Sequence, residues 1–183
     1  MSNDAVGDIA ESAAVAVVEP ESESGAARKR RRALEADICI KNHVIAAMGL
    51  GLIPSVLVDI VGVTGVEVKM IRDLAVIYRF PVPTKLVAYK VLISLIGSIG
   101  PLYFAAKMHS AMKGVPLLGH AVYVGFLSLS SGVAVYAVGK IFQEHYESGG
   151  TFLSSDNSVL RKFFKEKHKE GRGVVPTWVA QAT

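Results

Sequence analysis

Apolar residues dominate three stretches of the chain, and segments rich in charge or proline separate them. The longest uncharged stretch covers residues 115–139, and the stretch at 86–106 has Lys90 as its one charge. A helix over 115–139 would be about 37 Å long, enough to cross a hydrocarbon core of about 30 Å. The pattern therefore predicts an all-α protein with two membrane-spanning helices, 86–106 and 115–139, joined as a hairpin.

The third apolar stretch, residues 44–66, has Pro54 near its middle and Asp59 as its one charged side chain. Because proline removes a backbone donor and clashes with the preceding turn, we expect two helices, at about 35–52 and 55–79. A full third span would leave cations on the outer side, so the pair is predicted to form a broken, re-entrant or interfacial hairpin. A carboxylate at membrane depth is costly, which makes Asp59 either a functional group or a hydrogen-bonded helix cap.

Within the second of these helices, Thr64 and Glu67 have the spacing of a capping box, which predicts a helix start at this point. The apolar residues that follow share one helix face, while charged residues occupy the other. The predicted apolar face consists of Met70, Ile71, Leu74, Ile77 and Tyr78.

Both predicted spans have small residues at helical spacing. These are Ser94 and Ser98 in the first span and Gly125, Ser128, Gly132 and Gly139 in the second. In lipid, small side chains let helix backbones approach closely and gain packing contacts. The stripe therefore predicts packing within the hairpin or between copies of the chain, and the alternative is a substrate path.

The N-terminal segment, residues 1–34, is acidic at first and then strongly basic at 28–32. It has too few large apolar residues to build a core, so we expect a disordered tail. Basic residues beside a membrane segment favour contact with anionic lipid head groups and a cytoplasmic location of the flanks. We therefore expect both termini in the cytoplasm. No aromatic residues interleave the basic run, so nucleic acid is not an expected partner.

The C-terminal part predicts a short basic helix at 158–170, followed by a tail at 173–183. Asp156 or Ser158 would cap this helix, and Gly171 would end it. Apolar residues surrounded by cations are typical of a helix that lies on an anionic membrane surface, and the alternative is a helix docked on the protein's own body. The predicted membrane-surface residues are Arg161, Lys162, Phe163, Phe164 and Lys165.

Candidate catalytic chemistry is sparse. One cysteine excludes a disulfide framework and any multi-cysteine metal centre, and the five histidines are scattered. The sequence contains neither the phosphate-binding motif G-x-x-x-x-G-K-[ST] nor the zinc motif H-E-x-x-H. We therefore expect no catalytic residues, no cofactor and no metal.

Two segments carry recognisable signatures. Residues 40–83 combine an Ala/Gly-rich helix, a proline followed by an aspartate, and an amphipathic helix that ends in a tyrosine and a proline-containing turn. The second signature is a Gly-rich helix that runs into HYESGGT at 145–151. Together they resemble the YcjF-like family of bacterial inner-membrane proteins over roughly residues 35–172. The signature residues, whose role is unknown, are Pro54, Asp59, Met70, Tyr78, Tyr136, Gly139, His145, Glu147, Gly149 and Gly150.

The resemblance implies a helical integral membrane protein that is sometimes fused to a small GTPase domain. Since this chain has no such domain, a GTPase partner would act in trans. We therefore expect a non-enzymatic, multi-pass anchor or scaffold of the bacterial inner membrane that binds anionic lipid, a GTPase or other cytoplasmic protein, or a second copy of itself. The alternatives are a small oligomeric channel or transporter, with Asp59 and Lys90 as path residues, and a membrane-shaping protein.

Overall fold

The computed structural model describes residues 24–53, 56–99 and 118–181, and every regular element in these ranges is helical. The elements are α1 (Gly25–Leu50), α2 (Val56–Ile77), α3 (Lys85–Ile99), α5 (Leu118–Glu147), the short 3-10 helix η2 (Phe152–Ser154) and α6 (Asn157–Ala180). The prediction of an all-α fold is confirmed. The chain divides into two units, 1–31 and 32–183, and the packing described below belongs to the second. The basic residues 28–32, predicted to lie in a tail, are part of α1.

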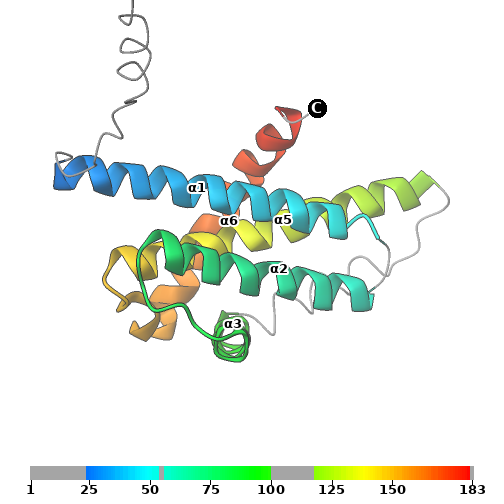
Figure 1. Ribbon diagram of the computed structural model, residues 1–183. Helices are drawn as coiled ribbons and strands as arrows, with labels where there is room; N and C mark the ends of the chain where they lie inside the picture. Colours follow the sequence, from blue (N-terminus) through cyan, green and yellow to red (C-terminus); the bar gives the residue numbers. More distant parts are fainter. Residues whose placement is uncertain (1–23, 54–55, 100–117, 182–183) are drawn as a thin grey trace, which may run out of the picture. The chain divides into compact units, whose positions relative to one another are not determined.

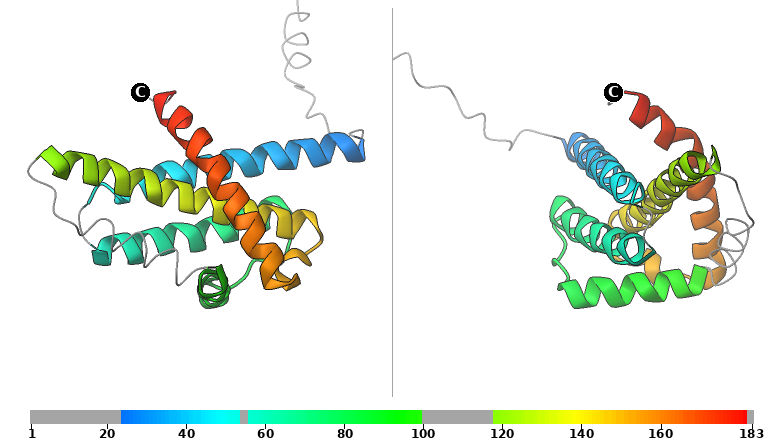
Figure 2. Two further views of the ribbon diagram at one scale, coloured as in Figure 1. Left: turned by 180° about the vertical axis from the view of Figure 1, so that it is seen from behind. Right: turned by 90° about the vertical axis from the view of Figure 1, so that its right-hand side faces the viewer.

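Helix α5 is the centre of the second unit. α1 and α2 run alongside it, α6 crosses it, and α3 packs on α2 and α6 (Figure 1, Figure 2). The middle of α5 is buried on all sides. Its buried side chains include Val133, Val135, Tyr136, Val138, Ile141 and Phe142. A helix that is apolar around its whole circumference is stable only inside an apolar environment, and here the neighbouring helices supply it.

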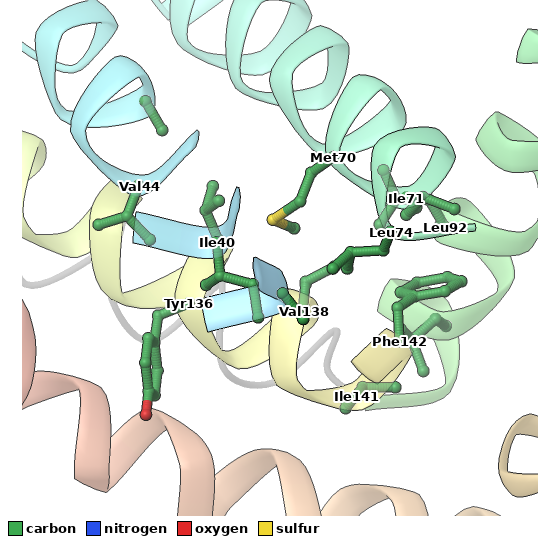
Figure 3. Close-up of a cluster of buried hydrophobic side chains, with 14 of the residues drawn as sticks. Ile40, Val44, Met70, Ile71, Leu74, Leu92, Tyr136, Val138, Ile141 and Phe142 are labelled. Atoms are coloured by element: carbon green, nitrogen blue, oxygen red, sulfur yellow. The ribbon is translucent and has the colours of Figure 1, made fainter. Parts of the chain in front are cut away.

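Each surrounding helix contributes one apolar stripe to the common core (Figure 3). The stripe of α1 consists of Ala36, Ile40, Val44 and Ala47, spaced by three or four residues as a helix face requires. From the predicted apolar face of α2, Met70, Ile71 and Leu74 are fully buried, and Ile77 and Tyr78 are partly buried. Burying one such large side chain stabilises the fold by about 1.5–3 kcal/mol.

The transmembrane hairpin predicted from the apolar runs is wrong. Within residues 24–53, 56–99 and 118–181, no helix combines the length and the apolar content that crossing a membrane requires. α3 has 15 described residues, or about 22 Å, and the rest of the first predicted span lies outside the described ranges. In the second predicted span, Val133, Val135 and Val138 are buried in the core of the protein itself.

The physical reason for this error is that an apolar run looks the same whether lipid or other helices surround it. The cytoplasmic orientation of the termini was derived from cations that flank the hairpin, so it no longer follows.

The broken hairpin predicted around Pro54 is also corrected. A break does fall between the end of α1 and the start of α2, although Pro54 itself lies outside the described residues. The two helices do not form a separate re-entrant unit, because Val44 and Met70 are buried in the same core. α2 continues without interruption through Thr64 and Glu67, so no helix starts there, and Glu67 is buried with 4% of its surface exposed.

The C-terminal helix is longer than the sequence predicts. α6 continues through Gly171 and Pro176, where an end and a tail were expected. Gly171 is buried, and a methyl group added to it would lie 2.8 Å from Cδ1 of Tyr136. This glycine therefore permits close contact between α6 and α5 and does not end the helix. The predicted cap at the other end is confirmed, because the Asp156 carboxylate accepts a hydrogen bond from the Ser158 N–H at 2.7 Å.

Candidate functional site

Residues of the two sequence signatures meet where α2 and α5 end. The hydroxyl of Tyr78 donates a hydrogen bond to Oε1 of Glu147 at 2.6 Å. The hydroxyl of Tyr146 donates to the carbonyl of Ile71 at 3.2 Å. Phe80, just after α2, packs on Tyr146 with ring centroids 5.2 Å apart. These contacts hold together the ends of α2 and α5, which are about 70 residues apart in the sequence.

Both helices end with the same backbone motif. In α5, the N–H of Gly150 donates to the carbonyl of His145 at 2.7 Å, and Gly149 has a φ of 74°. In α2, the N–H of Phe80 donates five residues back at 2.8 Å, and Arg79 has a φ of 57°. This is the Schellman motif, which requires a left-handed residue just after the helix and favours glycine there. The predicted helix end at Gly149 and Gly150 is confirmed.

Other signature residues also have structural roles. A methyl group on Gly139 would lie 3.1 Å from Sδ of Met70, so the glycine lets α2 and α5 touch closely. Nδ1 of His145 accepts a hydrogen bond from the Leu153 N–H at 3.3 Å, and burial lowers the pKa of this histidine, which favours the neutral ring. Asp59 belongs to α2, but its side chain lies outside the described part of the structure. The described signature residues therefore position helices.

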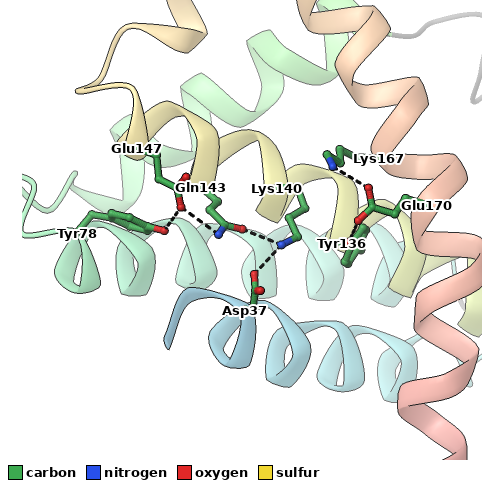
Figure 4. Close-up of polar contacts among 8 residues, drawn as sticks. All are labelled: Asp37, Tyr78, Tyr136, Lys140, Gln143, Glu147, Lys167 and Glu170. Atoms are coloured by element: carbon green, nitrogen blue, oxygen red, sulfur yellow. Dashed lines mark hydrogen bonds and ion pairs between the residues drawn. The ribbon is translucent and has the colours of Figure 1, made fainter. Parts of the chain in front are cut away.

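A chain of polar contacts links α1, α5 and α2 (Figure 4). Nζ of Lys140 donates to Oδ1 of Asp37 at 2.6 Å and to Oε1 of Gln143 at 2.9 Å. Nε2 of Gln143 donates to Oε1 of Glu147 at 3.2 Å, and this carboxylate also accepts from Tyr78. Burial, together with the neighbouring Glu147 carboxylate, raises the pKa of the Tyr78 hydroxyl. Each of these groups is hydrogen-bonded to a neighbouring side chain, so this series of polar contacts holds the helices together.

A second polar cluster joins α5 to α6. The hydroxyl of Tyr136 donates to Oε1 of Glu170, and Nζ of Lys167 donates to Oε2 of the same carboxylate at 2.7 Å (Figure 4). Burial opposes ionisation of Glu170, but the hydrogen bonds from Lys167 and Tyr136 outweigh it and lower the pKa of the carboxyl group. The signature residue Tyr136 therefore fixes the crossing of α6 over α5.

A cleft of about 550 Å³ opens between α1 and α2, with Glu35, Cys39, Asn42, His43, Lys69 and Asp73 among its walls. Cys39 and His43 are one turn apart on α1, and Asp73 faces them from α2. Nε2 of His43 lies 3.4 Å from Oδ2 of Asp73, and Sγ of Cys39 lies 3.7 Å from Nδ1 of His43. Lys69 pairs with the same carboxylate. Burial raises the pKa of the Cys39 thiol to about 11; Asp73 adds to the shift and Lys69 opposes it.

Helix α3 is apolar on both of its faces. Ala88, Leu92 and Leu95 are buried against the protein. On the outward side, Leu86 is 63% exposed and Ile93 is 50% exposed, and Val87 and Tyr89 are exposed as well. The water-facing side of a helix is normally polar. Lys90 and Ser94 are exposed on this side as well, beside the apolar stripe of Leu86, Tyr89 and Ile93. An exposed apolar stripe rimmed by polar residues is typical of a binding surface.

A family model described as a domain of unknown function (DUF697) matches residues 16–171 of this chain. The chain belongs to the DUF697 family. One relative, Magnetosome membrane protein 22 of Magnetospirillum gryphiswaldense, is 31% identical over 146 residues, which cover 78% of this chain and 73% of the relative. No solved structure matches the chain. The family resemblance inferred from the two signatures is confirmed.

In this DUF697 protein, part of the small-residue stripe lies at a contact between α5 and α1. The hydroxyl of Ser128 donates to the carbonyl of Met48 at 2.8 Å. A methyl group on Gly132 would lie 2.5 Å from Cγ of Met48, so α1 and α5 approach closely here. Elsewhere in the stripe, Gly125 and Ser94 are exposed, and the side chain of Ser98 lies outside the described part of the chain.

The basic helix of the DUF697 chain docks on its own helical body, which is the alternative that the sequence left open. Phe163 and Phe164 are half-buried and pack against the core. The ring centroids of Phe163 and Phe152 are 4.9 Å apart. The cations of the predicted membrane surface, Arg161, Lys162 and Lys165, are exposed. The outward side of this part of α6 is therefore basic, while its aromatic rings stabilise the fold.

Sequence reasoning missed the cleft between α1 and α2. The spacing of Cys39 and His43 was the available signal, because residues four apart share one helix face. Asp73 comes from another helix, and periodicity gives no register of one helix against the next. The same limitation hid the burial of Glu67.

Proposed function

We propose that this DUF697 protein is a non-enzymatic, membrane-associated scaffold that binds the surface of an anionic bilayer through the outward face of α3. The observation that carries the proposal is the exposed apolar face formed by Leu86, Tyr89 and Ile93. The name of the relative, a magnetosome membrane protein, supports a membrane as the apolar partner of this face.

Charge on and beside α3 suits an anionic surface. Lys85 and Lys90 are exposed on the helix itself. α6, which packs against α3, exposes Arg161, Lys162, Lys165, Lys169 and Arg172. Each cation held near an anionic leaflet contributes about 1 kcal/mol, and salt screens this attraction. Apolar side chains with cations on the same helix and on the helix packed against it are the chemistry of helices that lie in the membrane interface.

Burial of the exposed apolar side chains of α3 would contribute substantially to the free energy of membrane binding. Full burial of a leucine or isoleucine side chain is worth about 1.5–3 kcal/mol, and Leu86 and Ile93 have about half or more of their surface still to bury. The ring of Tyr89 is apolar and its hydroxyl is polar, which suits the boundary between acyl chains and head groups. Together these side chains would provide the contribution to binding that salt does not screen.

The scaffold part of the proposal is supported by how the signature residues are used. Those that the structure describes clamp helices together, so they build a rigid body at the bilayer. The resemblance to YcjF-like proteins, some of which are fused to small GTPase domains, supports a GTPase acting in trans as the protein that this body holds.

The proposal is tested by sedimentation of the purified full chain with phosphatidylglycerol-containing vesicles, and with phosphatidylcholine vesicles for comparison. The test variant is Leu86→Ser combined with Ile93→Ser, both on exposed positions of α3. The control is Leu34→Ser on α1, because Leu34 is 64% exposed and α1 lies away from α3 in both views (Figure 1, Figure 2).

We expect the wild-type chain to sediment with the anionic vesicles and to bind less as salt rises. The double variant should bind about tenfold or more weakly even at low salt, because the apolar contribution is lost. The Leu34→Ser chain should bind like the wild type. A wild-type chain that stays in solution with anionic vesicles, or equal losses in the α1 and α3 variants, would contradict the proposal.

A further inference from the structure

We propose that Cys39, His43 and Asp73 form a binding site for a divalent transition-metal ion of the zinc type, in the cleft between α1 and α2. Each residue offers one ligand atom, and the three atoms lie within 4.8 Å of one another. Two come from one face of α1 and the third from α2, so a bound ion would link the two helices. This site is separate from the membrane face of α3, and neither proposal depends on the other.

The hydrogen bond of His43 prepares its ring for a metal. Nδ1 lies 2.8 Å from the carbonyl oxygen of Cys39, which can only accept, so Nδ1 carries the proton. The lone pair of the neutral ring is then on Nε2, the atom that faces Asp73. Metal-binding histidines commonly donate their other N–H to a backbone carbonyl in this way, which fixes the tautomer and the ring orientation.

The distance between the histidine and the carboxylate also fits a shared ion. Nε2 of His43 and Oδ2 of Asp73 are 3.4 Å apart, which is longer than the usual N–H···O hydrogen bond of about 2.7–3.2 Å. Two ligands about 2.0–2.1 Å from a tetrahedral zinc ion stand about 3.3–3.4 Å from each other. Sγ of Cys39 lies 3.7 Å from Nδ1 of the same ring, and one ligand atom from each of the three residues lies within 4.8 Å of the others. Rotation of the cysteine side chain would bring its sulfur to the ion.

The surroundings of the three residues allow an ion to enter and to be held. The cleft of about 550 Å³ gives access, and Glu35 lies one turn before Cys39 on the same wall. Lys69 forms an ion pair with Asp73, but the Lys69 side chain is 69% exposed, so it can move aside when an ion binds to Asp73. Mixed sulfur, nitrogen and oxygen ligands favour Zn²⁺ or Co²⁺ over Mg²⁺ or Ca²⁺, which prefer oxygen ligands alone.

The experiment uses the purified full chain and Co²⁺ as a spectroscopic probe, followed by displacement with Zn²⁺. Because Cys39 is the one cysteine of the sequence, a thiol-alkylating reagent reports on this site alone. We expect a thiolate-to-cobalt absorption band that saturates at one ion per chain, and slower alkylation of Cys39 when Zn²⁺ is bound. Mg²⁺ should produce neither effect.

Variants then assign the ligands. Cys39→Ser, His43→Gln and Asp73→Asn should each weaken binding by more than the roughly 10- to 100-fold that loss of an outer-shell partner costs. Glu166→Gln, which removes an exposed carboxylate of α6, should bind like the wild type. Lys69→Gln should tighten metal binding by about 1.5- to 5-fold, because it removes an exposed ion pair that competes with the metal for Asp73.

The last variant keeps the test decisive if a ligand variant fails to fold, since Lys69 is exposed at the rim. Absence of the cobalt band in the wild-type chain would overturn the proposal. Binding that survives unchanged in folded Cys39→Ser and His43→Gln chains would place the metal elsewhere and would overturn it as well.

Discussion

Replacement of Glu67 by glutamine tests the burial of α2 against the rest of the fold. Glu67 is 4% exposed in the middle of this helix, and burial raises the pKa of its carboxyl group from 4.5 to about 8. The folded protein therefore keeps a proton on this group at neutral pH, whereas the unfolded chain releases it. Glutamine has nearly the same shape and stays neutral at every pH, so Glu67→Gln removes the titration while keeping the packing.

The sign of the effect follows from proton linkage. Between about pH 4.5 and 8 the folded state binds more protons than the unfolded state, so Glu67 makes stability fall as pH rises through this window. One pKa unit corresponds to about 1.4 kcal/mol, so between pH 5 and pH 7 the wild type should lose about 2–3 kcal/mol relative to Glu67→Gln. Stability from this group is fully present below the unfolded pKa.

The assay is urea unfolding of the full chain, followed by far-ultraviolet circular dichroism, at several pH values across this window. Other groups also titrate, but they do so in both proteins, so the difference between wild type and variant isolates Glu67. Glu166→Gln, at an exposed position of α6, is measured at the same pH values as the matched control. A Glu67→Gln difference that is independent of pH, or that grows toward acid, would refute the reasoning.

The remaining predictions concern glycines and helix ends, and unfolding free energies measured by urea denaturation check each of them. Gly51→Ala should destabilise by about 1–3 kcal/mol, because its new methyl group would lie 2.8 Å from the backbone Cα of Ser128. Gly49→Ala, with no atom within 4 Å of the new methyl, should stabilise by about 0.5–1 kcal/mol; equal effects of the two would contradict the close contact. Arg79→Gly should stabilise by about 1 kcal/mol, and Gly149→Ala should destabilise by a similar amount, because both positions are left-handed. Destabilisation by Arg79→Gly, or stabilisation by Gly149→Ala, would show that the Schellman ends are misassigned.

Local signals in the sequence predicted local structure well. A break between two helices was expected from the proline at position 54, and α1 ends at Leu50 while α2 begins at Val56. Asp156 caps the last helix by the side-chain hydrogen bond that its residue type favours. Gly149 ends α5 because only a left-handed residue completes that turn without strain. The apolar face of α2 around Met70 was also readable, since its period is set by the helix itself.

The sequence pattern did not predict what surrounds each helix. The apolar side chains of α5 are the same for a lipid or a protein environment, and the choice depends on where α1, α2 and α6 pack. Gly171 has the residue type of a helix end, but Tyr136 of another helix gives it a different role. The meeting of Cys39 and Asp73 depends likewise on the register between two helices, which no pattern within one helix contains.

The most direct test of membrane binding through α3 is the depth of its outward face in a bilayer. In a Cys39→Ser background, a single cysteine at position 86 or at position 34 accepts an environment-sensitive fluorophore. With phosphatidylglycerol-containing vesicles, we predict that the label at 86 becomes shielded from a water-soluble quencher, while the label at 34 stays as accessible as in buffer. A label at 86 that remains fully quenched, or equal shielding at both positions, would contradict the assignment of α3 as the membrane-binding face.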